Sequence, residues 1–374
     1  MGTAEVGIIA NPAAARDIRR LTADASSVTT NDKVNVLKRV LAGLASVGVE
    51  QVVAMTDRSG ISAGLHAARD RPSAAHWPTI DFLDVPLTGS AADTDAATRT
   101  MIAAGVGAIV VVGGDGTNRV VAARSGTTPL VSISTGTNNA FPAAVEPTVA
   151  GIAAGLVALD PDRFRSATYR AKQLLITVGD RVERALVDVA VCTTDGLGAG
   201  AVSDPRSISR LFLCFAEPDA IGLSAIGGHL RPTDRRAQHG LAMTLGTPAT
   251  ARVRPPIAPG RVVDGDVAAI VTLVVGEPHE LGGGVLAIDG ERMIRPGPQD
   301  DPVVVLSAQG PTVVDVSAVL SLAATTGALS WTGPAAPPPR APAELRAHTA
   351  NDTTTSSNGL HPRPLAGTPE KERS

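Results

Sequence analysis

The chain has 374 residues, and its 33 Lys and Arg stand against 36 Asp and Glu, which gives a formal net charge of −3. This balance provides no basic field, and only 2% of the residues are aromatic, so we expect no nucleic acid partner. The two cysteines, Cys192 and Cys214, cannot form a disulfide framework. The N-terminal residues lack the pattern of a signal peptide, and the longest apolar run, 267–275, is shorter than the ~20 residues that span a bilayer. We therefore expect a cytoplasmic protein with no membrane insertion.

The first part of the chain alternates apolar runs with segments of helical spacing. Strands are predicted at 6–10, 51–55, 80–85, 108–112 and 129–134, and helices at 32–48, 61–70, 89–105 and 148–159. Asn31 or Asp32 is the predicted cap of the helix over 32–48. This alternation predicts an α/β domain built on a parallel sheet.

From about residue 170 onward, the apolar runs are short and separated by Gly, Pro and Asp, which predicts a mainly antiparallel β domain of the sandwich type. The polar stretch 203–212 is predicted to add a helix. The predicted domains are a Rossmann-like nucleotide-binding domain over 1–160 and a β-sandwich substrate domain over 161–332. A disordered tail rich in Pro, Thr and Ser is predicted over 333–374.

The strand predicted at 108–112 runs into the motif GGDGT at 113–117, which precedes a short predicted helix. Gly113, Gly114 and Gly116 allow another group to approach the backbone closely, and free amides at a helix start bind anions. Asp115 is then either a carboxylate that faces a metal or a base beside a phosphoryl acceptor, unless it only caps the helix. Arg119 lies one turn further on, where it either contacts phosphate or is solvated.

The next predicted strand also ends in a small polar turn, which contains Gly136, Thr137, Asn138 and Asn139. Ligands of open parallel sheets bind beyond the carboxyl ends of the strands, so we expect this turn and the GGDGT turn to meet around a polyphosphate. The alternative is that Asn138 and Asn139 only favour the backbone conformation of a turn.

These motifs occur in a defined order along the chain. Asn11-Pro12 comes first, then GGDGT, GTNNAFP at 136–142 and IDGE at 288–291. This order resembles the NAD kinase / diacylglycerol kinase superfamily, and GIIANP, DIRRL, ALVDVAV and GLSAIGG are most similar to its ATP-NAD kinase-like branch, called AcoX. The resemblance covers roughly residues 5–330. It implies a Rossmann-like domain followed by a β-sandwich, with ATP or polyphosphate as phosphoryl donor and Mg²⁺ as the metal ion.

The resemblance also implies roles for particular residues. Asp115 matches the aspartate that serves as general base in NAD kinases, and we also expect it to face the metal. Asp289 and Glu291 match a candidate base of the lipid kinases, although Asp-Gly is also a common hairpin signal. The residues expected to bind nucleotide are Asn11, Gly113, Gly114, Gly116, Thr117, Arg119, Gly136, Thr137, Asn138, Asn139 and Asp188.

The resulting prediction is a kinase that phosphorylates a hydroxyl of NAD or a related dinucleotide. One departure from NAD kinases is Val187, which stands beside Asp188 where those enzymes carry Asn and Glu, and which cannot hydrogen-bond adenine. The alternatives are a kinase for a lipid or an acetoin-related alcohol, and a catalytically weak nucleotide-binding protein of acetoin catabolism. The expected partner is a small molecule, and a homodimer is left open.

Overall fold

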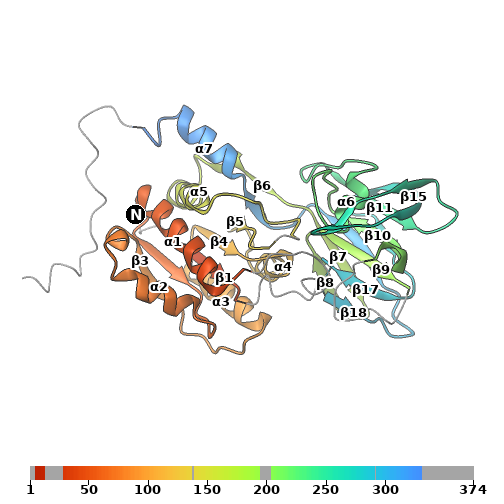
Figure 1. Cartoon of the computed structure of the whole chain (residues 1–374), viewed down its shortest axis with the longest axis horizontal. Coiled ribbons are helices and arrows are strands. Elements are labelled where there is room, and N and C mark those ends of the chain that lie inside the picture. The colour runs from red at the N-terminus through yellow and green to blue at the C-terminus, as the bar shows by residue number, and fades with distance from the viewer. Residues whose placement is uncertain (1–4, 13–27, 137–138, 194–203, 291, 331–374) are drawn as a thin grey trace, which may run out of the picture. The chain divides into compact units, whose positions relative to one another are not determined.

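A parallel sheet forms the first half of the computed structural model, which describes residues 5–12, 28–136, 139–193, 204–290 and 292–330 (Figure 1). The strand order in this seven-stranded sheet is β3-β2-β1-β4-β5-β20-β6, and only β6 runs antiparallel to its neighbour. Its strands are β1 (Glu5–Ala10), β2 (Gln51–Ala54), β3 (Thr79–Phe82), β4 (Ala108–Val112), β5 (Leu130–Ile133), β6 (Thr168–Arg170) and β20 (Thr312–Val314). The sheet confirms the predicted α/β fold.

Helices cover both faces of this sheet. The helices are α1 (Thr30–Ser46), α2 (Ile61–Arg69), α3 (Ala91–Ala104), α4 (Asp115–Ala122), α5 (Pro147–Leu159) and α7 (Val316–Thr325). Short 3-10 turns lie at Pro72–Ala74 and Arg165–Ala167. Alternate strand residues face opposite layers: Ile8 and Val110 pack with α1, α2, α5 and α7, whereas Ile9 and Val111 pack with α3 and α4. Both layers are buried, which explains why the strands read as uninterrupted apolar runs.

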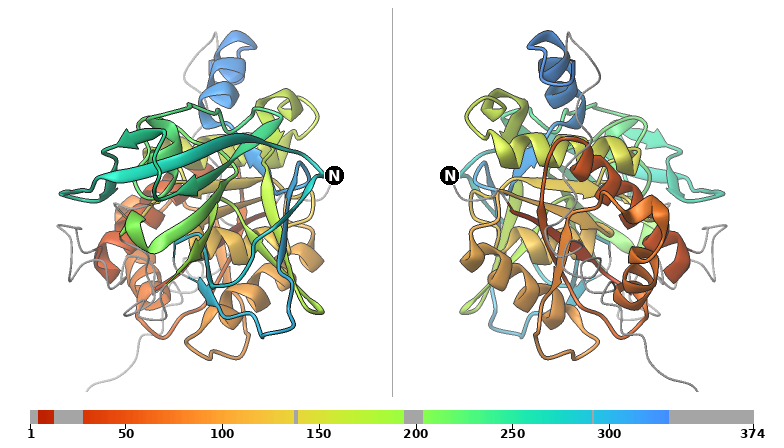
Figure 2. Two further views of the ribbon diagram at one scale, coloured as in Figure 1. Left: turned by 90° about the vertical axis from the view of Figure 1, so that its right-hand side faces the viewer. Right: turned by 90° about the vertical axis from the view of Figure 1, so that its left-hand side faces the viewer.

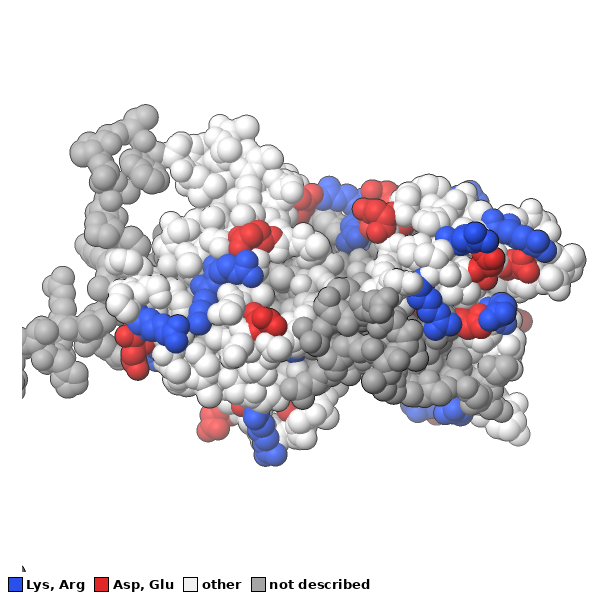
Figure 3. Space-filling view, viewed as in Figure 1, with Lys and Arg blue, Asp and Glu red and all other residues white. Residues whose placement is uncertain are grey.

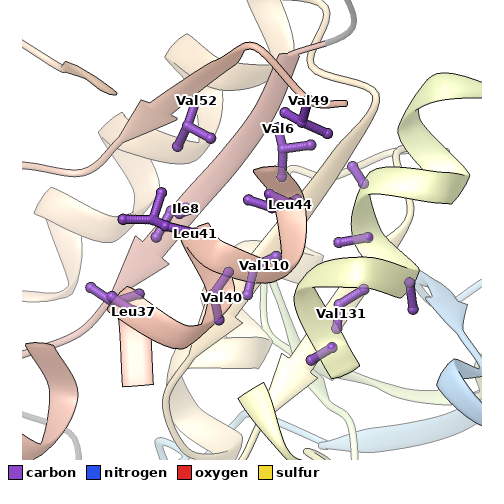
Figure 4. Close-up of a cluster of buried hydrophobic side chains, with 14 of the residues drawn as sticks. Val6, Ile8, Leu37, Val40, Leu41, Leu44, Val49, Val52, Val110 and Val131 are labelled. Atoms are coloured by element: carbon purple, nitrogen blue, oxygen red, sulfur yellow. The ribbon is translucent and has the colours of Figure 1, made fainter. Parts of the chain in front are cut away.

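Helix α1 packs against α5, and the apolar side chains beside this contact are drawn in Figure 4. Glycines on both helices lie at the contact itself. A Cβ atom on Gly43 would lie 2.2 Å from the carbonyl oxygen of Thr148, and one on Gly151 would lie 2.3 Å from that of Val40. The two backbones therefore approach without intervening side chains. Beside this contact, Leu41 and Leu44 are fully buried, and each contributes roughly 1.5–3 kcal/mol through burial.

The second half of the described chain consists of antiparallel sheets. A seven-stranded sheet has the order β12-β15-β11-β10-β9-β17-β18, and a four-stranded sheet has the order β16-β19-β7-β8. The strands of the larger sheet are β12 (Ala251–Val253), β15 (Gly265–Val274), β11 (His239–Leu245), β10 (Ile208–Leu213), β9 (Asp188–Cys192), β17 (Val285–Ile288) and β18 (Arg292–Ile294). The others are β16 (Pro278–Glu280), β19 (Val303–Ser307), β7 (Gln173–Val178) and β8 (Arg181–Ala185), with a separate hairpin of β13 (Pro256–Ala258) and β14 (Arg261–Val262).

The two antiparallel sheets share one apolar core, as expected for a sandwich. The left view of Figure 2 shows strands of this half facing the viewer. Leu174 and Leu306 of the smaller sheet pack in one cluster with Val189, Phe212 and Leu286 of the larger. A short helix, α6 (Ser224–Gly228), packs against the other face of the larger sheet, where Ile226 joins a second cluster. The predicted mainly β second half is confirmed.

Some local predictions were wrong. Residues 203–212 do not form the predicted helix, because Pro205–Ser207 is a 3-10 turn and the following residues form β10, which pairs with β9 and β11. The cap of α1 is Thr29 and not Asn31 or Asp32; Asp32 instead completes a capping box from the first turn. Helix α4 begins at Asp115, inside the GGDGT motif, whereas the sequence pattern places the short helix after the motif.

The described residues all belong to one unit of the chain, Met1–Arg340, in which β6, β20 and α7 return to the first sheet. The predicted boundary between two domains near residue 160 stays a prediction. None of the described helices combines the length and apolar character that crossing a membrane requires. On the face shown in Figure 3, basic and acidic side chains are interspersed, consistent with the balanced composition.

Candidate nucleotide and acceptor site

The GGDGT motif lies where the order of the parallel sheet reverses. The chain runs outward from β1 to β3 and then returns to β4 on the other side of β1. Open α/β sheets bind ligands at such a switch point. Here Asn11, directly after β1, donates a hydrogen bond from Nδ2 to Oγ1 of Thr117, at 2.8 Å. The ends of β1 and β4 are thereby linked.

Close packing explains the first two glycines of the motif. A Cβ atom on Gly113 would lie 2.8 Å from the side chain of Thr117, and one on Gly114 would lie 2.6 Å from Oδ1 of Asn139. Gly114 is the N-cap of α4, and Gly116 lies in its first turn. These glycines therefore make room for side chains of the protein itself at the start of the helix.

Buried polar side chains hold the start of α4 in place. Asn118 is fully buried and donates from Nδ2 to the carbonyl oxygen of Gly114, at 2.9 Å. Its Oδ1 accepts a hydrogen bond from Oγ of Ser132 in β5, at 2.6 Å. Asn118 and Ser132 could not be predicted as site residues, because a polar residue beside a motif gives no signal of such a partner.

Asp115 joins the GGDGT turn to the turn after β5. Its carboxylate is buried and accepts hydrogen bonds from the backbone amides of Ala140, at 3.1 and 3.2 Å, and of Phe141, at 2.8 Å. Asn139 lies beside both turns: its Nδ2 donates to Oγ of Ser134 at 3.0 Å. The two polar turns therefore meet at the carboxyl edge of the sheet, which is the arrangement that a shared phosphate site requires.

Arg119 of α4 reaches the β-sandwich through Asp289. Its Nη1 lies 3.1 Å from Oδ2 of Asp289 and 3.3 Å from the carbonyl oxygen of Ile288. The exposed fractions of the two side chains are 15% and 0%. Arg119 is therefore mostly buried, and its charge is paired with that of Asp289.

The other carboxylate oxygen of Asp289 is also engaged. Oδ1 accepts from the backbone amides of Leu186, Val187 and Asp188, at 3.0, 2.9 and 3.4 Å. Asp289 has a φ of 47°, a left-handed conformation that Asp tolerates better than most residues. Burial raises the pKa of its carboxyl, while Arg119 and the amides act in the opposite direction. These contacts place Asp289 as the link between α4 and the strand ends at 186–188, and its role as a base stays a prediction.

A pocket brings three predicted carboxylates together. It is a small, partly open cavity of about 20 Å³, and its lining includes Asp115, Asp188 and Asp289. Asp188 is buried at the start of β9. The rest of the wall is mostly apolar: Ala140, Val187, Ile221, Gly222, Leu223, Ile257 and Gly290. Most of the accessible lining of the pocket is nevertheless polar, so the pocket offers carboxylates with few apolar contacts.

One buried hydroxyl of the second turn has no partner among the described residues. It belongs to Thr135, just before Gly136, which is 7% exposed. No three His, Cys, Asp or Glu side chains within the described ranges are grouped closely enough to hold a metal ion. Mg²⁺ at nucleotide sites uses one or two carboxylates, substrate phosphates and water, so Asp115 alone is compatible with it.

Some predicted residues lie outside the described part of the chain. These are Thr137 and Asn138 in the second turn and Glu291 after the Asp-Gly pair. The structure brings the other predicted residues to one edge of the parallel sheet and to the facing strand ends of the sandwich.

Comparison with known proteins supports this assignment of the fold. Residues 6–160 match the family model of the ATP-NAD kinase N-terminal domain, and residues 172–309 match that of the acetoin catabolism protein X C-terminal domain. The chain thus has an NAD kinase-like α/β half joined to a β half of the acetoin catabolism protein X type.

A curated relative shows the family. The acetoin catabolism protein X of Cupriavidus necator is 42% identical over 326 residues, which are 84% of this chain and 91% of the relative. The chain belongs to the acetoin catabolism protein X family. A solved structure from Bacillus anthracis str. Sterne, provisionally assigned as a diacylglycerol kinase, has a TM-score of 0.42 and 12% identity, and covers 83% of this chain and 97% of that one.

Proposed function

We propose that this protein is a phosphotransferase that moves a phosphoryl group from ATP or polyphosphate to a hydroxyl of a small molecule. The observation that carries the proposal is the position of Asp115, whose carboxylate joins two polar turns and also lines a pocket. The NAD kinase-like α/β half supports the same class of reaction.

The roles of the residues follow from what phosphoryl transfer needs, which is positioning and the neutralisation of charge. The amides and hydroxyls of the GGDGT turn and of the turn at 135–139 hold the phosphates. Mg²⁺, when bound beside Asp115, supplies positive charge to the phosphate oxygens. Asp115 faces the pocket, where it accepts the proton of the attacking hydroxyl. Asp188 and the apolar wall orient the acceptor.

NAD is the first candidate acceptor, because of the NAD kinase-like half of the chain. A small hydroxylated metabolite is the second. Val187 lines the pocket with an apolar side chain, and its backbone amide is already bonded to Asp289. Ile221, Leu223 and Ile257 also line this pocket. Its small volume, about 20 Å³, suits a compact alcohol, and the name of the relative from Cupriavidus necator refers to acetoin.

The test is a phosphotransfer assay with γ-labelled ATP or polyphosphate and a panel of NAD, acetoin, small diols and diacylglycerol. We expect the wild-type protein to label one of these acceptors, and Asp115→Asn to lower turnover at least about a hundredfold, since a positioned base contributes roughly that much. Nucleotide binding, measured by calorimetry, serves as the control for an intact site in the variant.

Nucleotide binding without turnover of any acceptor in the panel would contradict the proposal. The protein would then be a nucleotide-binding member of its family. Activity of Asp115→Asn within a few-fold of wild type would remove Asp115 from the chemistry.

A further inference from the structure

An arginine of the β-sandwich half hydrogen-bonds to the same backbone segment, residues 140–141, that Asp115 binds. Arg235 lies shortly before β11, and its Nη1 donates to the carbonyl oxygen of Phe141 at 3.2 Å. Its Nη2 donates to the carbonyl oxygen of Ala140 at 3.3 Å. No sequence motif marks Arg235, so its role could not be predicted.

Asp115 and Arg235 bind the same two residues, Asp115 through their backbone amides and Arg235 through their backbone carbonyls. The amides of Ala140 and Phe141 donate to the carboxylate of Asp115, whereas their carbonyls accept from the guanidinium of Arg235. An acid from the α/β half and a base from the β half therefore fix one short stretch of backbone. Ala140 itself lines the pocket, so this stretch is part of the pocket wall.

Neighbouring side chains orient the guanidinium of Arg235. Its Nε lies 2.8 Å from Oε1 of Glu217, and its Nη2 lies 2.5 Å from Oε2, so the pair is bidentate. The guanidinium carbon lies 4.8 Å from the centre of the Phe215 ring. A planar fork with several donors can bind Glu217 and two carbonyls at once, whereas a lysine ammonium lacks this geometry.

We propose that Arg235, oriented by Glu217, is a positioning residue for the phosphotransfer site. It holds the 140–141 backbone against Asp115 and so sets the place of that carboxylate in the pocket. The inference rests on the proposed function for its effect on rate, but its effect on the backbone is independent of any reaction. Arg235 also couples the two halves of the site, because the residue that fixes the turn of the α/β half belongs to the β half.

The adjacent Arg236 provides a matched control. It pairs with Asp315, the N-cap of α7, and its guanidinium carbon lies 4.5 Å from the centre of the Tyr169 ring. Arg236 has the same charge and also joins the second half of the chain to the first sheet, but its contacts among the described residues are with Asp315 and Tyr169 and not with residues 140–141. Its substitution tests the effect of losing an arginine from this turn.

The experiment measures amide hydrogen exchange at Ala140 and Phe141 in the full chain. We expect Arg235→Ala and Arg235→Lys to accelerate exchange at both amides at least about tenfold, as local opening becomes easier, while Arg236→Ala leaves them within about twofold of wild type. Glu217→Gln gives a smaller acceleration, and methylguanidinium added to Arg235→Ala slows exchange again. Exchange that is unchanged in both Arg235 variants, or equally fast in Arg236→Ala, overturns the proposal.

Turnover supplies the second measurement. With an acceptor identified, Arg235→Lys is expected to lower kcat about tenfold or more, since small displacements of reacting groups are costly, while the Kd for ATP stays within about threefold. Methylguanidinium is expected to restore part of kcat in Arg235→Ala. A wild-type protein that transfers no phosphoryl group ends the proposed function but leaves the exchange result to decide the role of Arg235 in the backbone. Unchanged kcat in Arg235→Lys, with an active wild type, overturns the positioning role.

Discussion

Replacing Asp289 should lower the free energy of unfolding, because its carboxylate accepts hydrogen bonds from donors in both halves of the chain. Asp289→Gly removes the acceptor of three backbone amides and the partner of Arg119, whose side chain is 15% exposed. Breaking a buried pair by removing one partner costs about 3–5 kcal/mol. Glycine tolerates the φ of 47° at this position, so the loss reflects the missing contacts.

Asp289→Ala tests the backbone separately. Alanine disfavours the left-handed conformation by roughly 1–2 kcal/mol, so this variant should be less stable than Asp289→Gly by about that amount. Urea unfolding followed by circular dichroism gives both free energies, and a cycle with Arg119→Met isolates the ion pair. A loss below about 1 kcal/mol in Asp289→Gly would refute the linking role that we assign to this side chain.

Three further outcomes follow from buried groups and close contacts. Burial lowers the pKa of Lys172 to about 8, so the unfolded chain keeps the proton of this side chain to higher pH than the native protein does. The free energy of unfolding of the wild type, measured relative to Lys172→Met, should therefore rise between about pH 8 and 10, by at most about 1.4 kcal/mol per pH unit. Burial raises the pKa of Cys214 well above its ordinary value, so this thiol should react with a disulfide reagent no faster than the protein unfolds, and rapid labelling of the native protein would contradict this. Gly43→Ala places a methyl group 2.2 Å from the carbonyl oxygen of Thr148 and should cost about 1–3 kcal/mol in urea unfolding, whereas Gly283→Ala, with nothing within 4 Å, should be neutral.

The parallel sheet could be predicted because its strands are buried on both faces. Val110 and Val111 face opposite helix layers, so the whole of β4 is apolar and stands out in the sequence. The helix predicted at 203–212 was wrong because the structure of this segment depends on distant partners and not on its local pattern. The burial of Ile208, Leu211 and Phe212 depends on pairing with β9 and β11, and that pairing joins residues far apart in the chain.

The site could be predicted in part for a similar reason. Residues that follow strands of one parallel sheet share an edge, so the meeting of the GGDGT turn with the turn after β5 could be expected from strand order alone. The contacts of Arg235 and Glu217 could not be expected. They depend on how the β half lies against residues 140–141, which no local pattern of charge or hydrophobicity encodes.

The first sheet is completed by strands that come late in the chain. β20 pairs with β5 through Val313 and Leu130, and β6 then pairs with β20. Ala143 already bonds to Ser132 and Ser134 at one end of the β5 edge, so only the Leu130 end waits for β20 during synthesis. A fragment that stops near residue 160 leaves this end with unpaired backbone groups, which other chains can bind. Expression of the two halves as separate proteins is consequently a poor route to the native α/β half.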